Sequence, residues 1–108
     1  MNTLKINSPL DETEKIIYED GLRIKSLHFD KSVDLMLIIL NNKKVLTRNI
    51  SEFKRLKNAT EKELDNYKLI GNGTGVHWHK SDEDLSLKGF LRYEMLNAIQ
   101  FDKQKTMV

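Results

Sequence analysis

The chain has 108 residues, of which 39% are hydrophobic and 31% charged, and its formal net charge is +2. This length and composition are typical of one folded domain with a single hydrophobic core, and the absence of cysteine excludes a disulfide framework, zinc ribbons, iron–sulfur clusters and thiol nucleophiles. The longest apolar run, at residues 35–40, is far shorter than the roughly 20 residues of a membrane-spanning helix, and no signal-peptide pattern opens the chain, so we expect a cytoplasmic protein without a membrane partner.

The sequence divides into three parts. Residues 1–14 are a polar segment that contains the single proline, and we expect a flexible leader there. Residues 15–101 carry the apolar periodicity of a single α+β domain, and the polar residues 102–108 are expected to form a frayed tail. The domain is expected to open with a short edge strand or irregular lead-in at residues 15–18, followed by a turn at residues 20–21.

Two strands are predicted next. Residues 23–29 carry apolar side chains whose alternation breaks between Ile24 and Leu27, and this break indicates a β-bulge. Residues 33–40 are apolar nearly throughout, a pattern typical of a central strand that is covered on both faces.

A hairpin and a short helix are expected after the central strand. Two asparagines at residues 41–42 predict a two-residue turn, because asparagine tolerates a positive φ, and residues 43–49 complete the hairpin. Ser51 is then a candidate N-cap for a short helix that buries Phe53 and Leu56.

A capping box predicts where the next helix begins. Thr60 can accept a hydrogen bond from the backbone three residues later, while Glu63 reaches back to the backbone of Thr60. This helix is expected to turn Leu64 and Tyr67 inward and to end at Gly71, in the left-handed conformation of a C-terminal cap.

The last predicted elements are a brief extended segment at residues 76–78 and a C-terminal helix capped by Ser81 or Ser86. Strands grouped before helices indicate an α+β fold, in which a small antiparallel sheet of three to four strands packs against two to three helices. One stripe of the last helix is expected to face the core, formed by Leu87, Phe90, Leu91, Met95, Ala98 and Ile99.

Gly71, Gly73 and Gly75 lie close together in a stretch that invites comparison with a phosphate-binding loop. Such a loop requires a helix directly after its glycines, so that the helix N-terminus faces the phosphate. Here the glycines follow a predicted helix and precede an extended segment, and no Gly-Lys-Ser/Thr is present. We therefore interpret them as a structural turn.

His77 and His79 are the candidate metal ligands, because residues two apart on a strand share one face. Asp82 or Asp84 would supply the oxygen ligand of a three-ligand zinc site. Trp78 lies between the histidines and must bury its ring, and a lysine follows at position 80. We expect no metal, and a small metal-binding protein using His77 and His79 stays an alternative.

Asp82, Glu83 and Asp84 form an acidic cluster. Carboxylate pairs perform acid–base catalysis when they share a face and have separated pKa values. Acids directly before a helix have a simpler use, because they stabilise its positive end, and Glu83 is also a candidate for contact with a partner. No convincing nucleophile–base pair is present, so we expect neither catalytic residues nor a cofactor.

A basic cluster lies between residues 41 and 57 and is a candidate surface for a partner or for nucleic-acid phosphates. The adjoining segment contains three acids at positions 61, 63 and 65, and no nucleic-acid-binding motif is visible, so a protein partner is favoured over nucleic acid. The basic residues are Lys43, Lys44, Arg48, Lys54, Arg55 and Lys57.

Three stretches carry a family resemblance: FKRLKNATEKEL at residues 53–64, LIGNGTGVHW at 69–78 and DEDLSLKGFL at 82–91. On these, residues 23–91 resemble the small bacterial family called domain of unknown function 2442. The chain departs from the family pattern at Lys54, where a proline is common, at Tyr67, where a tryptophan is usual, and at His79, where a proline follows the His-Trp pair.

The resemblance implies that this segment is a structural signature. Trp78 would fill the core and His77 would bond to a backbone or carboxylate group, with Asp82 and Asp84 as candidates. Because His79 stands where the family has proline, a His77–His79 metal site cannot be a property of the family. The residues of the signature are Gly71, Gly73, Gly75, His77, Trp78, Asp82 and Asp84.

The resemblance also implies a class of function. Members of the family are small, non-catalytic-looking α+β domains, some fused to a helix-turn-helix, and many are encoded beside proteins of the domain-of-unknown-function 4160 family in pairs that resemble toxin–antitoxin systems. The residues after Leu91 are too few for a helix-turn-helix. We therefore expect a non-enzymatic protein-interaction module, an antitoxin-like partner of a small toxin. The alternative is a nucleic-acid-associated transcriptional regulator, and homo-oligomers are compatible with either.

Overall fold

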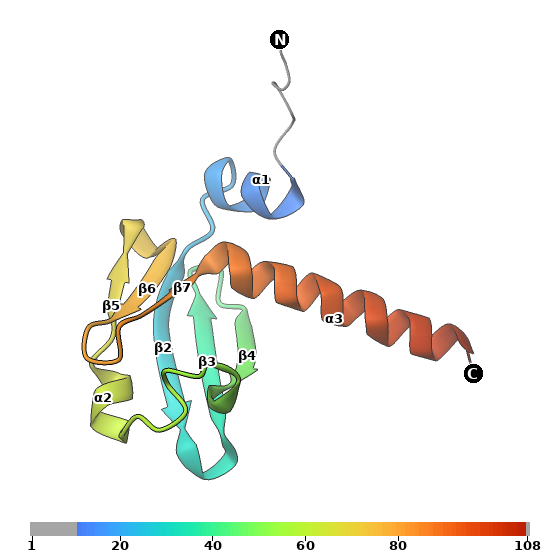
Figure 1. The fold of residues 1–108 in the computed structure, drawn as a ribbon. Coiled ribbons are helices and arrows are strands. Elements are labelled where there is room, and N and C mark those ends of the chain that lie inside the picture. The colour runs from blue at the N-terminus through green and yellow to red at the C-terminus, as the bar shows by residue number, and fades with distance from the viewer. Residues whose placement is uncertain (1–10, 108) are drawn as a thin grey trace.

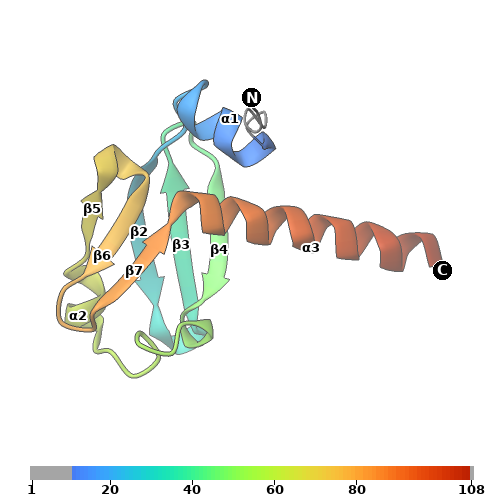
Figure 2. The same cartoon turned by 45° about the horizontal axis from the view of Figure 1, so that its top comes forward.

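The computed structural model describes the backbone of residues 11–107 and the side chains of residues 11–98. Residues 1–10 of the expected leader, the side chain of Ile99 and the side chains of the expected tail lie outside the described residues, so the domain boundaries stay predictions. The described chain has the expected α+β fold, with three α-helices and two three-stranded antiparallel sheets (Figures 1 and 2). The elements are α1 (Glu12–Tyr18), β2 (Ile24–Asp30), β3 (Leu35–Leu40), β4 (Val45–Asn49), α2 (Glu61–Asp65), β5 (Lys68–Ile70), β6 (Gly75–Trp78), β7 (Glu83–Ser86) and α3 (Leu87–Met107).

The first sheet has the strand order β2-β3-β4, so β3 is central as predicted. The register between β2 and β3 shifts between Ile24 and Ser26, which confirms the predicted irregularity in β2. The β3–β4 register then runs without interruption from the pair of Leu35 with Asn49 to the pair of Ile39 with Val45.

The hairpin between β3 and β4 differs from the prediction in its turn. The positive φ of 73° falls on Lys43 and not on an asparagine. The Leu40 N–H donates to the Lys44 carbonyl at 2.9 Å, so three residues form the loop, and the third residue of such a loop takes the left-handed conformation. Asn41 serves the loop in another way, because its side-chain oxygen accepts the Arg23 N–H at 3.0 Å.

The two faces of the first sheet differ in burial. Exposure alternates strictly along β3, so the prediction that this strand is covered on both faces is wrong for one of them. The inner face is buried by the rest of the described chain, whereas the outer face has no comparable cover among the described residues. Met36, Ile38 and Leu40 point inward, and Leu35, Leu37 and Ile39 lie partly exposed on the outer face.

Helix α1 occupies residues where we expect an edge strand or irregular lead-in from the sequence. Asp11 is its N-cap and accepts the Glu14 N–H at 2.8 Å, and Glu14 accepts the Asp11 N–H at 3.1 Å. This reciprocal capping box starts the helix within the expected leader. Ile17, with 2% exposure, then anchors α1 to the core.

No α-helix begins at Ser51. Residues 50–52 form a 3₁₀ turn, and Ser51 donates its N–H to the Asp34 carboxylate at 2.9 Å, and its hydroxyl as well, in place of capping a helix. Leu56 is nevertheless buried, and Phe53 packs partly buried against the core.

Helix α2 confirms the predicted capping box, since Thr60 Oγ1 accepts the Glu63 N–H and Glu63 accepts the Thr60 N–H. The helix ends at Asp65, however, and not at Gly71. The residues before Gly71 pair with β6 as strand β5, so their backbone groups are used in a sheet. Gly71 has a positive φ of 57°, but it begins the turn between β5 and β6.

Helix α3 is capped by Ser86, one of the two predicted candidates, whose hydroxyl accepts the Gly89 N–H at 3.0 Å. Ser81 lies in the preceding turn, because strand β7 separates it from the helix.

The apolar stripe of α3 faces the core only over the first turns. Leu87 and Phe90 are buried and Leu91 is partly buried. Met95 is 44% exposed and Ala98 is also exposed, so the predicted stripe is wrong for these two residues. The reason is visible in Figures 1 and 2, where α3 leaves the body of the protein and projects past the β4 side.

Candidate interaction surfaces

Trp78 lies at the centre of the structure, where the second sheet meets the first. Its side chain is 1% exposed, and its indole N–H donates to the Leu64 carbonyl at 3.0 Å. The rings of Phe29 and Tyr67 pack against it with centroids 6.2 and 6.5 Å away. The Tyr67 hydroxyl in turn accepts the Leu27 N–H at 3.0 Å, so one aromatic cluster joins β2, β6 and the segment between α2 and β5.

The three glycines of the signature allow close backbone approach in the same region. Gly73 has a φ of 88°, and a Cβ atom built there would lie 2.8 Å from the Ile24 carbonyl oxygen. A Cβ atom at Gly75 would lie 3.1 Å from the Ile70 side chain, and Gly71 has a φ of 57°. These are the constraints of a turn packed on a neighbouring strand.

His77 and Asp84 face each other across β6 and β7, with His77 Nδ1 2.6 Å from Asp84 Oδ1. This is one of the two carboxylate contacts that we expect for His77. The other candidate, Asp82, accepts from Arg55 instead, through its backbone oxygen at 2.6 Å and its carboxylate at 3.3 Å. The rings of His77 and His79 lie 6.2 Å apart, and no group of three or more His, Asp or Glu suited to hold a metal occurs among the described side chains.

The acidic cluster does not lie at the N-terminus of a helix, so that interpretation is wrong. Glu83 and Asp84 belong to strand β7 and pair with Trp78 and His77 of β6. Asp82 has a positive φ of 52° in the turn before the strand. Glu83 is partly exposed and its carboxylate accepts the Asp84 N–H at 3.0 Å, so its contribution to a partner surface stays a prediction.

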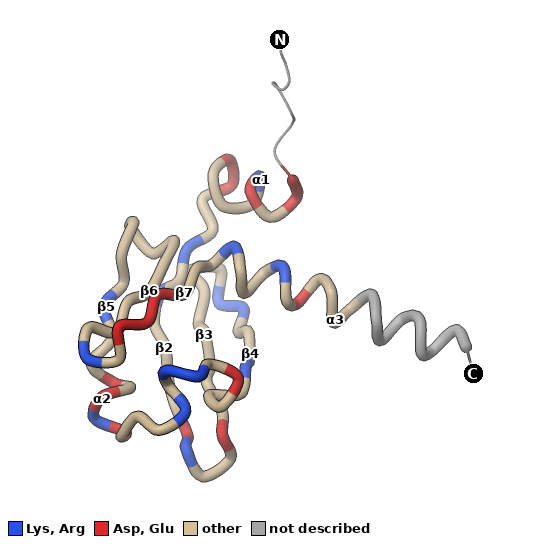
Figure 3. Tube along the Cα trace, in the orientation of Figure 1, with Lys and Arg blue, Asp and Glu red and all other residues tan. Residues whose placement is uncertain are grey.

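The six basic residues do not form one patch (Figure 3). Lys43 and Lys44 lie in the hairpin at one end of β4, and Lys54, Arg55 and Lys57 follow its other end.

Arg48 points to the inner face, where its guanidinium lies 3.6 Å from the centroid of Tyr93 and 2.7 Å from the Glu52 carboxylate. Burial, which alone would raise the pKa of Glu52, is outweighed by the hydrogen bonds from Arg48 and the Asn49 N–H, so that pKa is lowered. Arg48 is therefore a packing residue.

The outer face of the first sheet is an apolar surface that sequence reasoning missed. Cross-strand pairs place the three outward β3 side chains between a polar row on β2 and a mixed row on β4. The sequence nevertheless contains a signal for this surface. All six residues of β3 are apolar, but successive side chains of a strand point to opposite faces, so a sheet with one buried face leaves three of them on the other face. The rows across the sheet are Ser26–Ile39–Val45, His28–Leu37–Thr47 and Asp30–Leu35–Asn49. We call these nine residues the outer sheet face.

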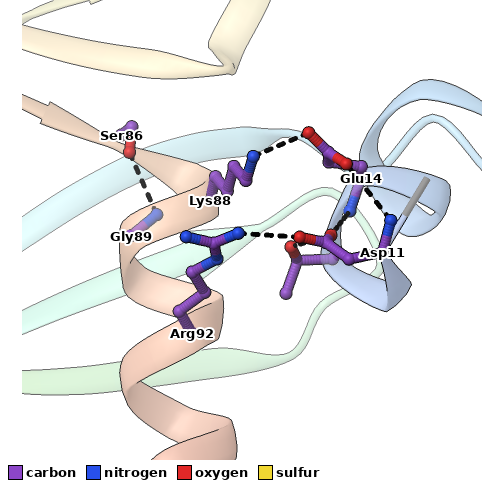
Figure 4. A network of polar contacts seen from close by, with 7 residues as sticks. Asp11, Glu14, Ser86, Lys88, Gly89 and Arg92 are labelled. Atoms are coloured by element: carbon purple, nitrogen blue, oxygen red, sulfur yellow. Dashed lines mark hydrogen bonds and ion pairs between the residues drawn. The ribbon is translucent and has the colours of Figure 1, made fainter. Parts of the chain in front are cut away.

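A second feature missed from the sequence is the polar network that ties α1 to α3 (Figure 4). Lys88 lies 2.6 Å from Glu14, and Arg92 lies 2.8 Å from Asp11. Thr13 donates its hydroxyl to Asp11 at 2.6 Å. The hydrogen bonds from Thr13 and Arg92 hold the pKa of Asp11 well below its usual range, and Lys88 lowers the pKa of Glu14.

Together these features define a class of protein: a small α+β domain, braced by a buried Trp78, with an apolar outer sheet face and a projecting C-terminal helix. No described helix has both the length and the apolar content needed to cross a membrane. The chain belongs to the family of proteins of unknown function DUF2442, whose model matches residues 24–95.

Two solved structures are similar. A protein of unknown function from Rhodospirillum rubrum, known from a crystal structure, is 26% identical, with a TM-score of 0.58 over 67% of this chain and 87% of that one. The uncharacterized protein CV0863 from Chromobacterium violaceum, known from a solution NMR structure, is 21% identical, with a TM-score of 0.62 over 85% of this chain and 84% of that one. The second likeness shows the fold alone. A search of curated proteins finds no match.

Proposed function

We propose that this protein is a non-enzymatic interaction module that binds another protein through the outer sheet face. The observation that supports this is the row of Leu35, Leu37 and Ile39, three apolar side chains left partly exposed at the centre of a sheet. Exposed apolar surface of this kind, rimmed by polar residues, is typical of protein-binding sites. Val45, 47% exposed, extends the apolar surface toward the edge strand.

The partner that fits best is a small protein encoded next to this one, with this chain acting as its antitoxin-like neutralising subunit in the cytoplasm. Support for this comes from the family resemblance and from the kind of surface presented. An aliphatic sheet face offers shape and apolar area without a charge pattern, and obligate partners bury such surfaces. The two separated groups of lysines and arginines give weaker support to a nucleic-acid partner.

Co-expression with the product of the adjacent gene tests the proposal. We expect a stable complex that buries on the order of 1,200–2,000 Å² and that restores growth when the neighbour alone is toxic. Leu37→Asp should abolish both, because a carboxylate cannot be buried unpaired in an apolar interface.

A matched control is Leu69→Asp, since Leu69 is a partly exposed leucine on β5 of the other sheet, 37% exposed. This variant should bind and rescue like the wild type. If neither a complex nor rescue is found with the wild type, the proposal is wrong. DNA binding with a steep salt dependence would instead support a nucleic-acid-associated regulator.

A further inference from the structure

The outer edge of β4 carries backbone groups that no described residue pairs. The Leu40 N–H donates to the Lys44 carbonyl at 2.9 Å and the Ile50 N–H to the Asp34 carbonyl at 3.1 Å, at the two ends of the β3–β4 ladder. In an antiparallel ladder, alternate residues face the partner strand, so residues 44, 46, 48 and 50 face β3. The N–H and C=O groups of Val45 and Thr47 therefore point away from the sheet.

This edge lacks the features that usually block strand addition. β4 contains no proline and pairs with β3 in an uninterrupted register without a bulge. The charged residue of β4, Arg48, does not guard the edge, because its side chain lies on the inner face against Tyr93 and Phe53. Val45 and Thr47 are exposed along the edge.

Helix α3 projects over the same edge. The contact between Arg48 and Tyr93 places α3 across β4, and beyond this point the helix runs past the sheet (Figures 1 and 2). The 15 residues from Tyr93 to Met107 correspond to about 22 Å of helix. Met95 and Leu96 are 44% and 60% exposed in this projecting part. A helical segment of this length is marginal in water without tertiary contacts, so its apolar side chains favour a partner.

We propose that a second copy of the chain adds to this edge, with the two β4 strands pairing antiparallel about a two-fold axis perpendicular to the sheet. Such an axis keeps the inner faces of both copies on the same side, so the two α3 helices cross the seam in opposite directions. The projecting half of each helix then lies over the seam, where Met95 and Leu96 contact the other copy. The product is a six-stranded continuous sheet spanned by two helices.

Antiparallel pairing brings the Lys43–Lys44 hairpin of one copy to the Asn49 end of β4 in the other copy. Glu52, which follows Asn49, already pairs with Arg48 of its own chain, so backbone pairing and helix contacts carry this arrangement and charge does not. Five-residue strands alone bury little of the roughly 1,200 Å² that a stable interface needs, so the strand edge and the helices must both contribute. The two-fold arrangement also leaves the outer sheet face open in both copies, which makes it independent of the proposed function.

Sedimentation equilibrium of the full chain tests the dimer, and Thr47→Pro tests its strand seam. Proline at position 47 removes an N–H that points away from β3, so it leaves the β3–β4 ladder intact while blocking the seam. We expect a dimeric wild type and a monomeric, folded Thr47→Pro variant. Leu96→Lys, on the exposed projecting helix, should weaken dimerisation at least tenfold while leaving the circular dichroism spectrum unchanged.

The controls separate this interface from the others. Leu69→Lys should stay dimeric, and Leu37→Asp should stay dimeric even where it loses a hetero-partner. A wild type that is monomeric at every soluble concentration would overturn the proposal. A dimer that survives both Thr47→Pro and Leu96→Lys, or that is lost in Leu37→Asp, would also overturn it.

Discussion

His77 Nδ1 lies 2.6 Å from Asp84 Oδ1, and the two residues are directly opposed on β6 and β7 of the second sheet. On its other side His77 is paired with Lys68 of β5, so one row across the sheet contains a cation, an imidazole and a carboxylate. The Asp84 side chain is 67% exposed and that of His77 is 29% exposed. This exposure makes the pair a cross-strand contact on a solvated surface.

We expect the His77–Asp84 pair to contribute little to stability. A double-mutant cycle with His77→Ala and Asp84→Ala should give a coupling energy of about 0.2–1 kcal/mol in chemical denaturation, the range for exposed pairs. His79→Ala is the matched control, because His79 is exposed in the adjacent turn. A coupling above about 3 kcal/mol, typical of a buried pair, would contradict this description.

Trp78→Phe should destabilise the protein by about 2–3 kcal/mol. The smaller ring leaves a cavity in the aromatic cluster, and the Leu64 carbonyl loses its donor. Urea denaturation followed by circular dichroism measures the loss. Tyr18→Phe is the control, because Tyr18 is 65% exposed, and it should change stability by less than about 0.5 kcal/mol.

Gly73→Ala and Gly21→Ala should differ in cost although both glycines have positive φ values, of 88° and 78°. At Gly21 nothing lies within 4 Å of the added Cβ, so only the backbone conformation is penalised, by about 1–2 kcal/mol. At Gly73 the Cβ would meet the Ile24 carbonyl oxygen at 2.8 Å, and the chain must shift. We expect Gly73→Ala to cost at least about 1 kcal/mol more than Gly21→Ala. Equal losses in thermal or urea unfolding would contradict the close approach.

The network between α1 and α3 should give the protein an acid-dependent loss of stability. The folded state lowers the pKa values of Asp11 and Glu14, so it binds their protons more weakly than the unfolded chain does. Their contribution is therefore fully present above the ordinary carboxyl pKa values of about 4 and is lost as the pH falls below them. Urea midpoints between pH 6 and pH 3 should fall less steeply for Asp11→Asn and Glu14→Gln than for the wild type. Glu12→Gln, on the same helix turn, should follow the wild type, and parallel curves for all the variants would refute the role of the network.

Local patterns in the sequence predict several elements correctly, because their causes are local. The capping box at Thr60 and the Ser86 cap of α3 depend on residues three positions apart. The same signal was present in Asp11 and Glu14, and it would have identified α1 in place of an edge strand. Strand order in the first sheet also follows from the apolar run of β3.

The candidate site was harder to predict, because its features depend on long-range pairing. From the sequence alone, the acids at residues 82–84 are interpreted as the start of a helix. Only the pairing of Glu83 and Asp84 with β6 shows that they belong to a strand and its turn. Arg48 belongs to a basic stretch in the sequence, but Tyr93 of α3, forty-five positions away, turns it into a packing residue. The glycines were interpretable as a structural turn because their neighbours excluded a phosphate loop, whereas the structural role of His77 and Trp78 was implied by the family resemblance. Helix α3 leaves the body at a point that only the tertiary packing of Leu87 and Phe90 defines.

Trp78 is the single tryptophan of the chain, and it is held between the two sheets. Its fluorescence emission therefore reports whether the two sheets remain packed against each other, without any added label. In the intact domain the emission maximum should be blue-shifted and insensitive to iodide or acrylamide. Separation of the sheets would expose the indole and move the maximum to longer wavelength, even if α3 kept its helical signal.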